Sequence, residues 1–222
     1  MTLEEILQEL QSLENPGNVE GMARFGIRGK KVFGVSLPEL RAIARRAGKS
    51  HALARQLWKS GAHEARLLAC LVEDPDRVTA SQMERWALDF DNWAICDGCC
   101  LHLFDKTSFA FSKAAAWSRR NEEFVKHAGF ALMAVLAVHD KQAPDSSFSN
   151  WMPLIEKAST DSRNFVKKAV NWALRQIGKR NKNLHQPVVG RGFELDEALR
   201  PGEPLGSTQL GWILETLRKR FL

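Results

Sequence analysis

A tryptophan and an aspartate four residues apart, Trp93 and Asp97, are the side chains best placed to do chemistry together. On a helix, residues at positions i and i+4 share a face and reach the same space. An indole face attracts positive charge, and a carboxylate stabilises it by Coulomb attraction, most strongly in a partly dry groove. The pair therefore suits a cationic ligand. Taken alone, such a pair is more often a core tryptophan beside an aspartate bound to an arginine.

A basic helix face is the second candidate, because no acidic residue occurs from Ser162 to Phe193. A helix beginning near Arg163 would carry cations and amides on one face and apolar residues on the other. The residues of the polar face are Asn164, Lys167, Lys168, Asn171, Arg175 and Lys179. Trp172 lies on its flank. Cations bind phosphates and an indole stacks on a base or sugar, so this face is typical of nucleic-acid binding. Packing of Trp172 between two helices is the open alternative.

The charge distribution extends this expectation to a second segment. The net charge is +6 with a pI near 9.3, and from Arg24 to Lys49 the only acid is Glu39. Two separate basic zones predict a surface that follows a phosphate backbone. Solvated helix faces with no ligand are the alternative, since net charge alone is weak evidence.

The four cysteines do not form a recognisable metal or disulfide motif. Cys96 and Cys99 form a CxxC pair, but no second pair or His-x-x-x-His completes a zinc site. Cys100 adjoins Cys99, and such crowding is poor spacing for disulfides. The sequence favours reduced thiols that pack between helices, in a cytoplasmic protein without a metal or another cofactor.

Helical periodicity dominates the chain, and no run of alternating strand residues occurs. Capping residues and apolar stripes predict helices at about 3–13, 37–47, 51–59, 63–72, 80–90, 93–103, 107–117, 122–138, 148–158 and 163–179. The segment Asn15-Pro16-Gly17-Asn18 is expected to end the first of them. No apolar run approaches the roughly 18 residues of a membrane span, and the acidic amphipathic start does not fit a secretory signal.

An internal sequence repeat suggests how these helices are arranged. The segment Phe124–Ala128 resembles Phe165–Ala169, which lies 41 residues later. Helical-pair solenoids of the HEAT kind repeat every 40–47 residues or so. We therefore expect an all-α, HEAT-like α-solenoid of stacked antiparallel helix pairs with a concave basic groove. It should form a single domain over 1–222, mainly loop from about 181 to 206 before a short final helix.

Taken together, Trp93 with Asp97, the segment Phe124–Phe130 and the segment Lys168–Arg175 resemble the AlkD-like DNA alkylation repair glycosylases. The resemblance runs from about residue 32 to residue 181. Members of that family are HEAT-like solenoids that excise N3- and N7-alkylated purines. They hold duplex DNA in a concave basic groove and need no base flipping, unlike most glycosylases.

The resemblance implies roles for individual residues. Asp97 would be the catalytic carboxylate, stabilising the oxocarbenium-like sugar and positioning water, and the two tryptophans would flank the lesion. His127, ten residues after Trp117, stands where relatives have an arginine, and Ala94 stands where many have a second acid. The residues expected to bind substrate or DNA are Trp93, Trp172, His127, Lys126, Lys167, Lys168, Asn171, Arg175 and Lys179.

The expected partner is double-stranded DNA with alkylated bases, bound by a monomer with no membrane and no obligate protein partner. A cationic alkylated purine is already a good leaving group, so one carboxylate is enough to assist its departure. The departures at positions 94 and 127 favour an alternative, a non-catalytic HEAT-like protein that recognises damaged or bent DNA. A protein-interaction scaffold is a third possibility, against which the acid-free stretch around Trp172 argues.

Overall fold

The computed structural model describes residues 1–29 and 31–186, and within them every regular element is a helix. The all-α class expected from the sequence is therefore confirmed. The chain divides into two compact units, Met1–Phe109 and Ala110–Leu222. The helix pairs of a solenoid contact mainly their neighbours, so two compact units are compatible with one solenoid domain. The single domain expected from the sequence stays a prediction. No helix in the described part of the chain has the length and apolar character needed to cross a membrane.

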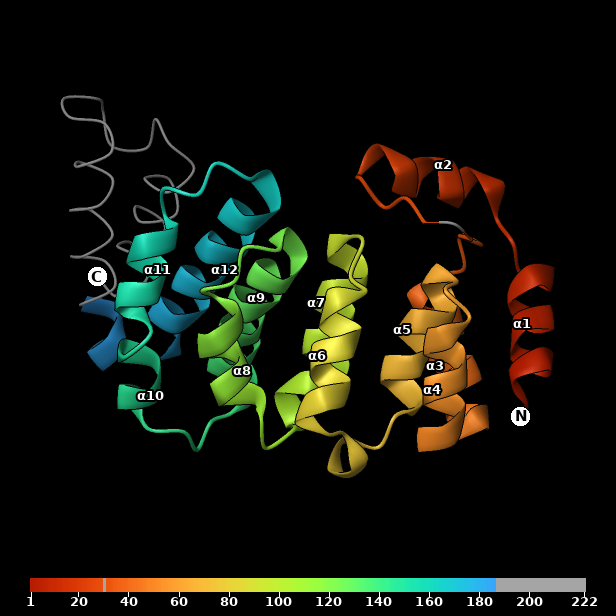
Figure 1. Ribbon diagram of the computed structural model, residues 1–222, viewed down its shortest axis with the longest axis horizontal. Helices are drawn as coiled ribbons and strands as arrows, with labels where there is room; N and C mark the ends of the chain where they lie inside the picture. The colour runs from red at the N-terminus through yellow and green to blue at the C-terminus, as the bar shows by residue number, and fades with distance from the viewer. Residues whose placement is uncertain (30, 187–222) are drawn as a thin grey trace. The chain divides into compact units, whose positions relative to one another are not determined.

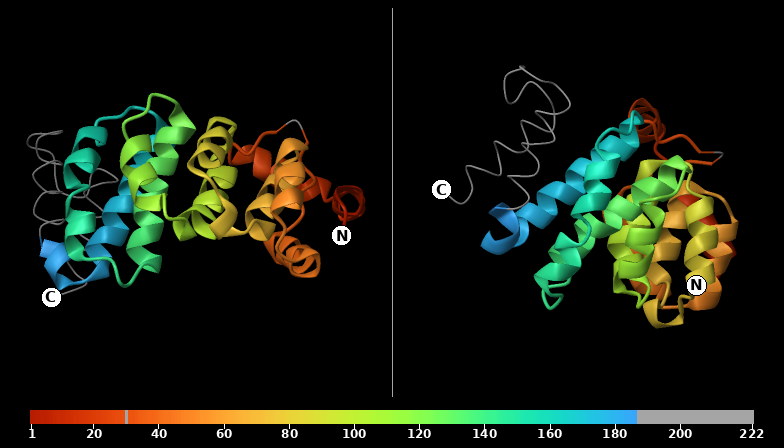
Figure 2. Two further views of the ribbon diagram at one scale, coloured as in Figure 1. Left: turned by 60° about the horizontal axis from the view of Figure 1, so that its bottom comes forward. Right: turned by 60° about the vertical axis from the view of Figure 1, so that its left-hand side comes forward.

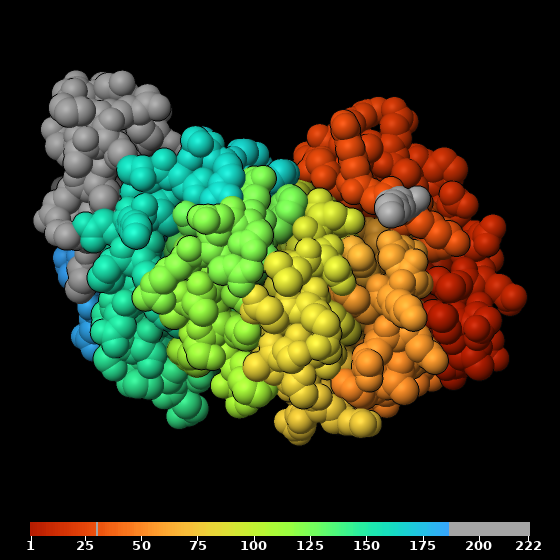
Figure 3. Space-filling view, viewed as in Figure 1, coloured from red at the N-terminus to blue at the C-terminus, as the bar shows by residue number. Residues whose placement is uncertain are grey.

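The first unit is built on helices that pack mainly against other helices near them in sequence (Figure 1). Its elements are α1 (Leu3–Ser12), α2 (Pro16–Arg24), α3 (Leu37–Ala47), α4 (His51–Lys59), α5 (His63–Val72), η1 (Pro75–Arg77), α6 (Ala80–Leu88), α7 (Trp93–His102) and η2 (Phe104–Lys106). Helix α5 packs against α3, α4 and α7. The gap that the ribbon leaves between α5 and α7 is filled by side chains in the space-filling view (Figure 3).

Capping residues set the starts of these helices as the sequence indicates. The Thr2 hydroxyl accepts from the backbone N–H of Glu5 at 3.2 Å, and the Glu5 carboxylate accepts from the backbone N–H of Thr2 at 2.9 Å. Such a reciprocal box satisfies two donors that the first helical turn leaves unpaired. At the other end of a helix, Gly48 terminates α3 with a φ of 71°, a conformation that favours glycine.

The core of the first unit contains a cluster of aromatic rings. The rings of Trp58 and Trp86 lie parallel with centroids 4.1 Å apart, and Phe90 and Phe104 pack against them. Each such pair contributes about 0.5–1.5 kcal/mol beyond its buried area. The indole N–H of Trp58 donates to Asp89 Oδ2 at 2.9 Å, so this edge of the cluster keeps its hydrogen bond.

Helix α2 was not expected from the sequence. The segment Asn15–Asn18 was expected only to end the first helix, but Asn15 also caps a new one, with Pro16 in its first turn. Proline and an asparagine cap fit a turn and a helix start equally well. None of the residues of α2 is buried, so it lacks the apolar stripe by which a helix is recognised. It is held instead by polar contacts, Asn15 N–H to Phe33 O at 2.8 Å and Asn18 Nδ2 to Gly34 O at 2.9 Å.

The second unit is built around two long helices. Its elements are α8 (Ala110–Trp117), α9 (Glu123–His139), α10 (Asp145–Ser149), α11 (Met152–Ala158) and α12 (Asn164–Arg180). Helices α9 and α12 lie side by side, and α8 packs on α9 (Figures 1 and 2). From His127 to Ala137, α9 is buried on all sides, as expected of the central helix of a unit. The single helix expected at 148–158 is two helices, because Pro153 favours a new start in the first turn of α11.

The end of α12 is tied down by an arginine. Arg180 donates to Ala137 O at 3.1 Å and to Ala143 O at 2.8 Å, and its guanidinium lies 4.2 Å from the centroid of the Phe148 ring. Beyond it, residues 182–186 are helical where loop was expected. Asn181 explains this difference, since its Oδ1 accepts from the backbone N–H of Leu184 at 3.0 Å and caps a new turn. The rest of the expected loop, to residue 206, and the final helix lie outside the described residues.

Candidate functional site

The start of α7 is fixed by a buried asparagine. Asn92 has no exposed surface, and its Oδ1 accepts from the backbone N–H groups of Ala94 at 3.0 Å and Ile95 at 3.2 Å. Its amide nitrogen donates to Asp91 Oδ1 at 2.7 Å. Because a buried cap has little freedom, Trp93 is placed firmly in the first turn of the helix.

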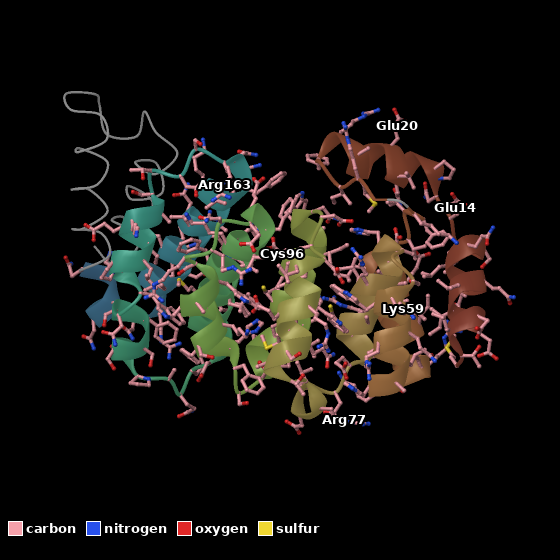
Figure 4. All side chains as sticks on the ribbon, in the orientation of Figure 1. Glu14, Glu20, Lys59, Arg77, Cys96 and Arg163 are labelled. Atoms are coloured by element: carbon pink, nitrogen blue, oxygen red, sulfur yellow. The ribbon has the colours of Figure 1, made fainter. Side chains whose placement is uncertain are left out.

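Trp93 and Asp97 lie one turn apart on α7, and both are half-buried. Cys96, labelled in Figure 4, marks this part of the helix and is buried. The indole N–H of Trp93 donates to the backbone carbonyl of Phe25 at 2.9 Å. That hydrogen bond joins α7 to the end of α2 and fixes how the indole is oriented. The helix and the spacing expected for this pair are therefore present, with both side chains partly accessible.

A pocket of about 570 Å³ opens between Trp93 and α2. It is lined by Gly17, Asn18, Gly21, Met22, Phe25, Ile27, Gly34, Val35, Ser36 and Trp93. Phe25 is 73% exposed, the most exposed large apolar side chain among the described residues. The pocket has no signal in the sequence, because it depends on α2 and because an exposed phenylalanine cannot be told from a buried one by residue type.

A second, basic pocket of about 370 Å³ lies at the end of α3. Its walls include Arg41 and Arg45, which are exposed, together with Lys49 and Leu71. The Lys49 ammonium donates to Leu71 O at 3.1 Å and to Glu73 O at 2.8 Å. Burial, reinforced by the positive charge of Lys106, lowers the pKa of Lys49. An anion in this pocket would meet two exposed guanidinium groups, as the basic stretch from Arg24 to Lys49 predicts.

Helix α12 has the two faces that its sequence indicates. The apolar stripe is buried, from Val166 to Ile177. On the opposite side Lys167 and Lys168 are exposed. Four further residues of this polar face and its flank are half-buried: Asn171, Trp172, Arg175 and Lys179. The Arg175 Nε is buried without a hydrogen-bond partner among the described residues, so this guanidinium is incompletely satisfied in the protein alone.

Lys126 differs from the exposed lysines of α12 because its charge is already paired. Its ammonium lies 2.8 Å from Asp161 Oδ2, and Arg163 binds the same carboxylate through Nε at 2.9 Å and through its terminal nitrogen at 2.7 Å. The hydrogen bonds from Arg163, followed by those from Lys126, hold the pKa of Asp161 well below its usual range. Binding of Lys126 to DNA would have to compete with this ion pair.

His127 is placed in the interior and not at the surface where a DNA contact was expected. It is 3% exposed, and its Nδ1 donates to the backbone carbonyl of Phe165 at 3.0 Å. A carbonyl can only accept, so Nδ1 carries the hydrogen. The residue therefore joins α9 to α12. The sequence pattern was misleading because Lys126-His127 echoes Lys167-Lys168, while α9 is buried on all sides and α12 is not.

All four cysteines are buried in the first unit, as expected of packing residues. The Sγ atoms of Cys70 and Cys99 lie 2.8 Å apart and join α5 to α7. Burial raises the pKa of the Cys96, Cys99 and Cys100 thiols. The thiols are accordingly poor nucleophiles in the folded protein.

Comparison with known proteins agrees with this architecture. The solved structure of a protein from a family related to the HEAT-like repeat DNA glycosylases, with affinity for branched DNA structures, matches with a TM-score of 0.83 at 20% identity. The match covers 99% of this chain and 95% of that one, which shows that the fold is HEAT-like.

Two uncharacterised bacterial proteins are also similar. One, from Listeria innocua serovar 6a, is 23% identical over 196 residues, covering 85% of this chain and 84% of its own. Another, from Listeria monocytogenes serovar 1/2a, is 26% identical over 136 residues, covering 60% of this chain and 61% of its own. The model of the DNA alkylation repair enzyme family matches residues 6–194. The chain therefore belongs to the DNA alkylation repair enzyme family.

Proposed function

We propose that the protein is a DNA glycosylase that excises cationic N3- and N7-alkylated purines from duplex DNA. Its family supports a role in alkylation repair. The observation that carries the proposal is the pair on α7, a half-buried indole and a half-buried carboxylate one helical turn apart. An aromatic face beside a negative charge suits a substrate that carries positive charge before and during the reaction.

Exposed cations in each unit support binding to the DNA backbone. Arg41 and Arg45 line the basic pocket of the first unit, and Lys167 and Lys168 lie on the accessible face of α12 in the second. Contacts of this kind are independent of base sequence and release counterions from the DNA. They would hold the duplex while the residues of α7 meet the lesion.

The chemistry follows from the charge of the lesion. A purine alkylated at N3 or N7 is cationic, so it leaves with the electron pair of the glycosidic bond and becomes neutral without a general acid. The positive charge then passes to the deoxyribose, where the Asp97 carboxylate stabilises it and positions the attacking water. Cation–π attraction to Trp93 adds about 0.5–2 kcal/mol and favours cationic over neutral bases.

The substitution Asp97→Asn tests the proposal, because the amide keeps the shape of the side chain and removes its charge. Release of 3-methyladenine and 7-methylguanine from methylated duplex should fall at least about 100-fold, as when a single electrostatic group is removed from an active site. Affinity for the duplex should not change, and the fold should be retained. Asp76→Asn, an exposed carboxylate of the same unit, is the matched control and should excise at the parent rate. Equal excision by Asp97→Asn and the parent would remove Asp97 from the mechanism.

A non-catalytic DNA-binding protein is the second candidate. Two observations favour it: His127, expected in place of an arginine at the backbone, is buried, and Ala94 supplies no second acid. The structural neighbour described above has affinity for branched DNA structures. The same assay separates the two functions, since the second candidate requires that the parent protein bind DNA and release no base.

A further inference from the structure

We propose that the pocket between α2 and Trp93 holds one unstacked nucleobase of the bound DNA, with Phe25 and Trp93 as its aromatic walls. This inference rests on the proposed DNA binding, and it adds a base-holding site to it. The pocket lies entirely within the first unit, and its volume of about 570 Å³ falls in the range of small-molecule sites, roughly 300–1,000 Å³.

The space exists because α2 turns its glycines towards the pocket. Gly17 and Gly21 line it, and a Cβ added to Gly21 would meet no atom within 4 Å. Glu20 stands on the outer side of α2, where it pairs with Arg24 at 2.7 Å (Figure 4). Glycine in the middle of a helix costs about 1 kcal/mol relative to alanine. Gly21, in the middle of α2, therefore lowers the stability of the helix and leaves open space beside the pocket.

The aromatic walls are suited to stacking. Phe25 is exposed at the end of α2, next to Gly26, whose φ of 80° turns the chain. The indole N–H of Trp93, its only hydrogen-bond donor, is used by the carbonyl of Phe25. Trp93 therefore has only its ring faces and carbon edges to offer a ligand. Such walls bind planar rings by stacking, at about 1–3 kcal/mol per stacked base.

The charge around the pocket points to a base attached to phosphate. Arg28 and Lys31 lie in the segment that leads away from α2, and both are exposed. The acids close to the pocket in sequence are Glu14, Glu20, Glu39, Asp91 and Asp97. Glu20 is paired with an arginine, Glu39 caps α3, and Asp91 lies 3.5 Å from Arg66. An apolar, aromatic cavity with exposed cations beside it matches a nucleotide of DNA, whose ring enters while its phosphate stays outside.

The pocket would accept any of the bases. Its polar side chains are already occupied, since Asn18 Nδ2 donates to Gly34 O at 2.9 Å and the Ser36 hydroxyl donates to Glu39 at 2.7 Å. Few groups remain to read a Watson–Crick edge. Unpaired bases should be preferred over paired ones, because removing a paired base from the stack costs a few kcal/mol.

The test fills the pocket from α2. Gly21→Leu places a side chain into open space and raises helix propensity by about 1 kcal/mol, so the fold should be retained. The indole ¹H–¹⁵N signal of Trp93, identified by its loss in Trp93→Phe, is followed during titration with deoxyadenosine monophosphate. We expect a saturable shift in the parent and none in Gly21→Leu. Gly21→Ala and Ala23→Leu, a change on the same helix outside the pocket lining, should respond as the parent does.

Two further measurements complete the test. Deoxyribose 5-phosphate, which has no base, should leave the Trp93 signal unmoved, and Phe25→Ala, a change at an exposed residue, should weaken the nucleotide response. On DNA, the parent should bind a duplex with one bulged base at least about 5-fold more tightly than a fully paired duplex, which corresponds to one stacked base. Gly21→Leu should lose this preference and keep its affinity for the paired duplex.

The outcomes separate this inference from the proposed function. A Trp93 signal that ignores the nucleotide in the parent, or that shifts equally in Gly21→Leu, overturns the base-holding pocket. A parent that responds to the nucleotide but does not bind paired duplex at low salt overturns the proposed function and leaves the pocket standing.

Discussion

At the scale of single residues, Asp161 pairs with two cations of the second unit, Lys126 and Arg163, which are therefore less available to bind DNA. It is only 9% exposed at its side chain and binds Lys126, Arg163 and the backbone N–H of Arg163. Because the carboxylate is paired in the folded protein, its pKa is lowered, chiefly by Arg163. A lowered pKa means that the folded protein holds the ionised form more strongly than the unfolded chain does.

We expect Asp161→Asn to lower the free energy of unfolding by about 1–3 kcal/mol at pH 7, the usual worth of hydrogen bonds to charged groups. The contribution of Asp161 is complete above its unfolded pKa of about 3.9 and is lost as pH falls towards its lower folded pKa. The difference between parent and variant should therefore shrink below about pH 4. Denaturant unfolding at pH 7, 5, 4 and 3 measures it, and a difference that stays constant over this series would contradict the assignment.

Residue types and spacing predicted the pair Trp93 and Asp97, because an i, i+4 relation on a helix is local geometry. They could not predict that His127 is buried. The repeat around Phe124 and Phe165 indicates equivalent helices, but the exposure of each depends on what packs on it. α9 is covered on all sides, whereas α12 keeps an accessible face.

At the scale of elements, α12 combines a buried apolar stripe with exposed cations, and its polar face can be tested as a unit. Replacing Lys167, Lys168 and Arg175 together with alanine should weaken duplex binding whatever the sequence. It should also reduce the slope of log K against log salt by up to about 0.9 for each phosphate that the variant no longer neutralises.

A salt titration by fluorescence anisotropy measures both effects. The matched control is Lys141→Ala with Lys157→Ala, two lysines of the same unit that lie outside α12. Unchanged affinity in the triple variant would show that α12 does not bind the DNA backbone.

Replacing glycine with alanine should have opposite effects on stability at two positions, Gly129 and Gly21. A Cβ on Gly129 of α9 would lie 2.4 Å from the backbone nitrogen of Ser118 and 2.8 Å from the carbonyl carbon of Trp117, and backbone atoms cannot move aside cheaply. Gly129→Ala should thus destabilise the protein by about 1–3 kcal/mol through overpacking. Gly21→Ala in α2 meets open space and should stabilise by up to about 1 kcal/mol. Unfolding curves that move in the same direction for both variants would contradict this account.

Most elements could be predicted from sequence because their signals are local. The capping box of Ser36 and Glu39, the glycine that ends α3 and the apolar stripe of α12 each consist of residues close in sequence, and each is present in the structure. Helix α2 could not be predicted in this way, because it buries none of its residues and is held by backbone carbonyls of Phe33 and Gly34 that are remote in sequence.

At the scale of the whole molecule, the family match spans residues 6–194 and therefore includes residues of both compact units. The all-α HEAT-like fold could be predicted from a repeat spacing because a solenoid depends on contacts between neighbouring helices. The candidate site could be predicted only in part. Its charged residues and the proposed catalytic carboxylate lie on recognisable helices, while the pocket beside Trp93 depends on a helix without a sequence signal.

The burial of all four cysteines has a further consequence for a protein of this family. Methylating agents react with thiolates as well as with DNA, because the thiolate is a strong nucleophile. Cys70, Cys96, Cys99 and Cys100 are buried, and the pKa values of the last three are raised, so the folded protein exposes no thiolate of its own to the agents whose damage its family repairs. After treatment with methyl methanesulfonate, mass spectrometry should find the cysteines unmodified in the native protein and methylated in the unfolded chain. The folded protein would therefore resist alkylation of its own cysteines by the agents that damage DNA.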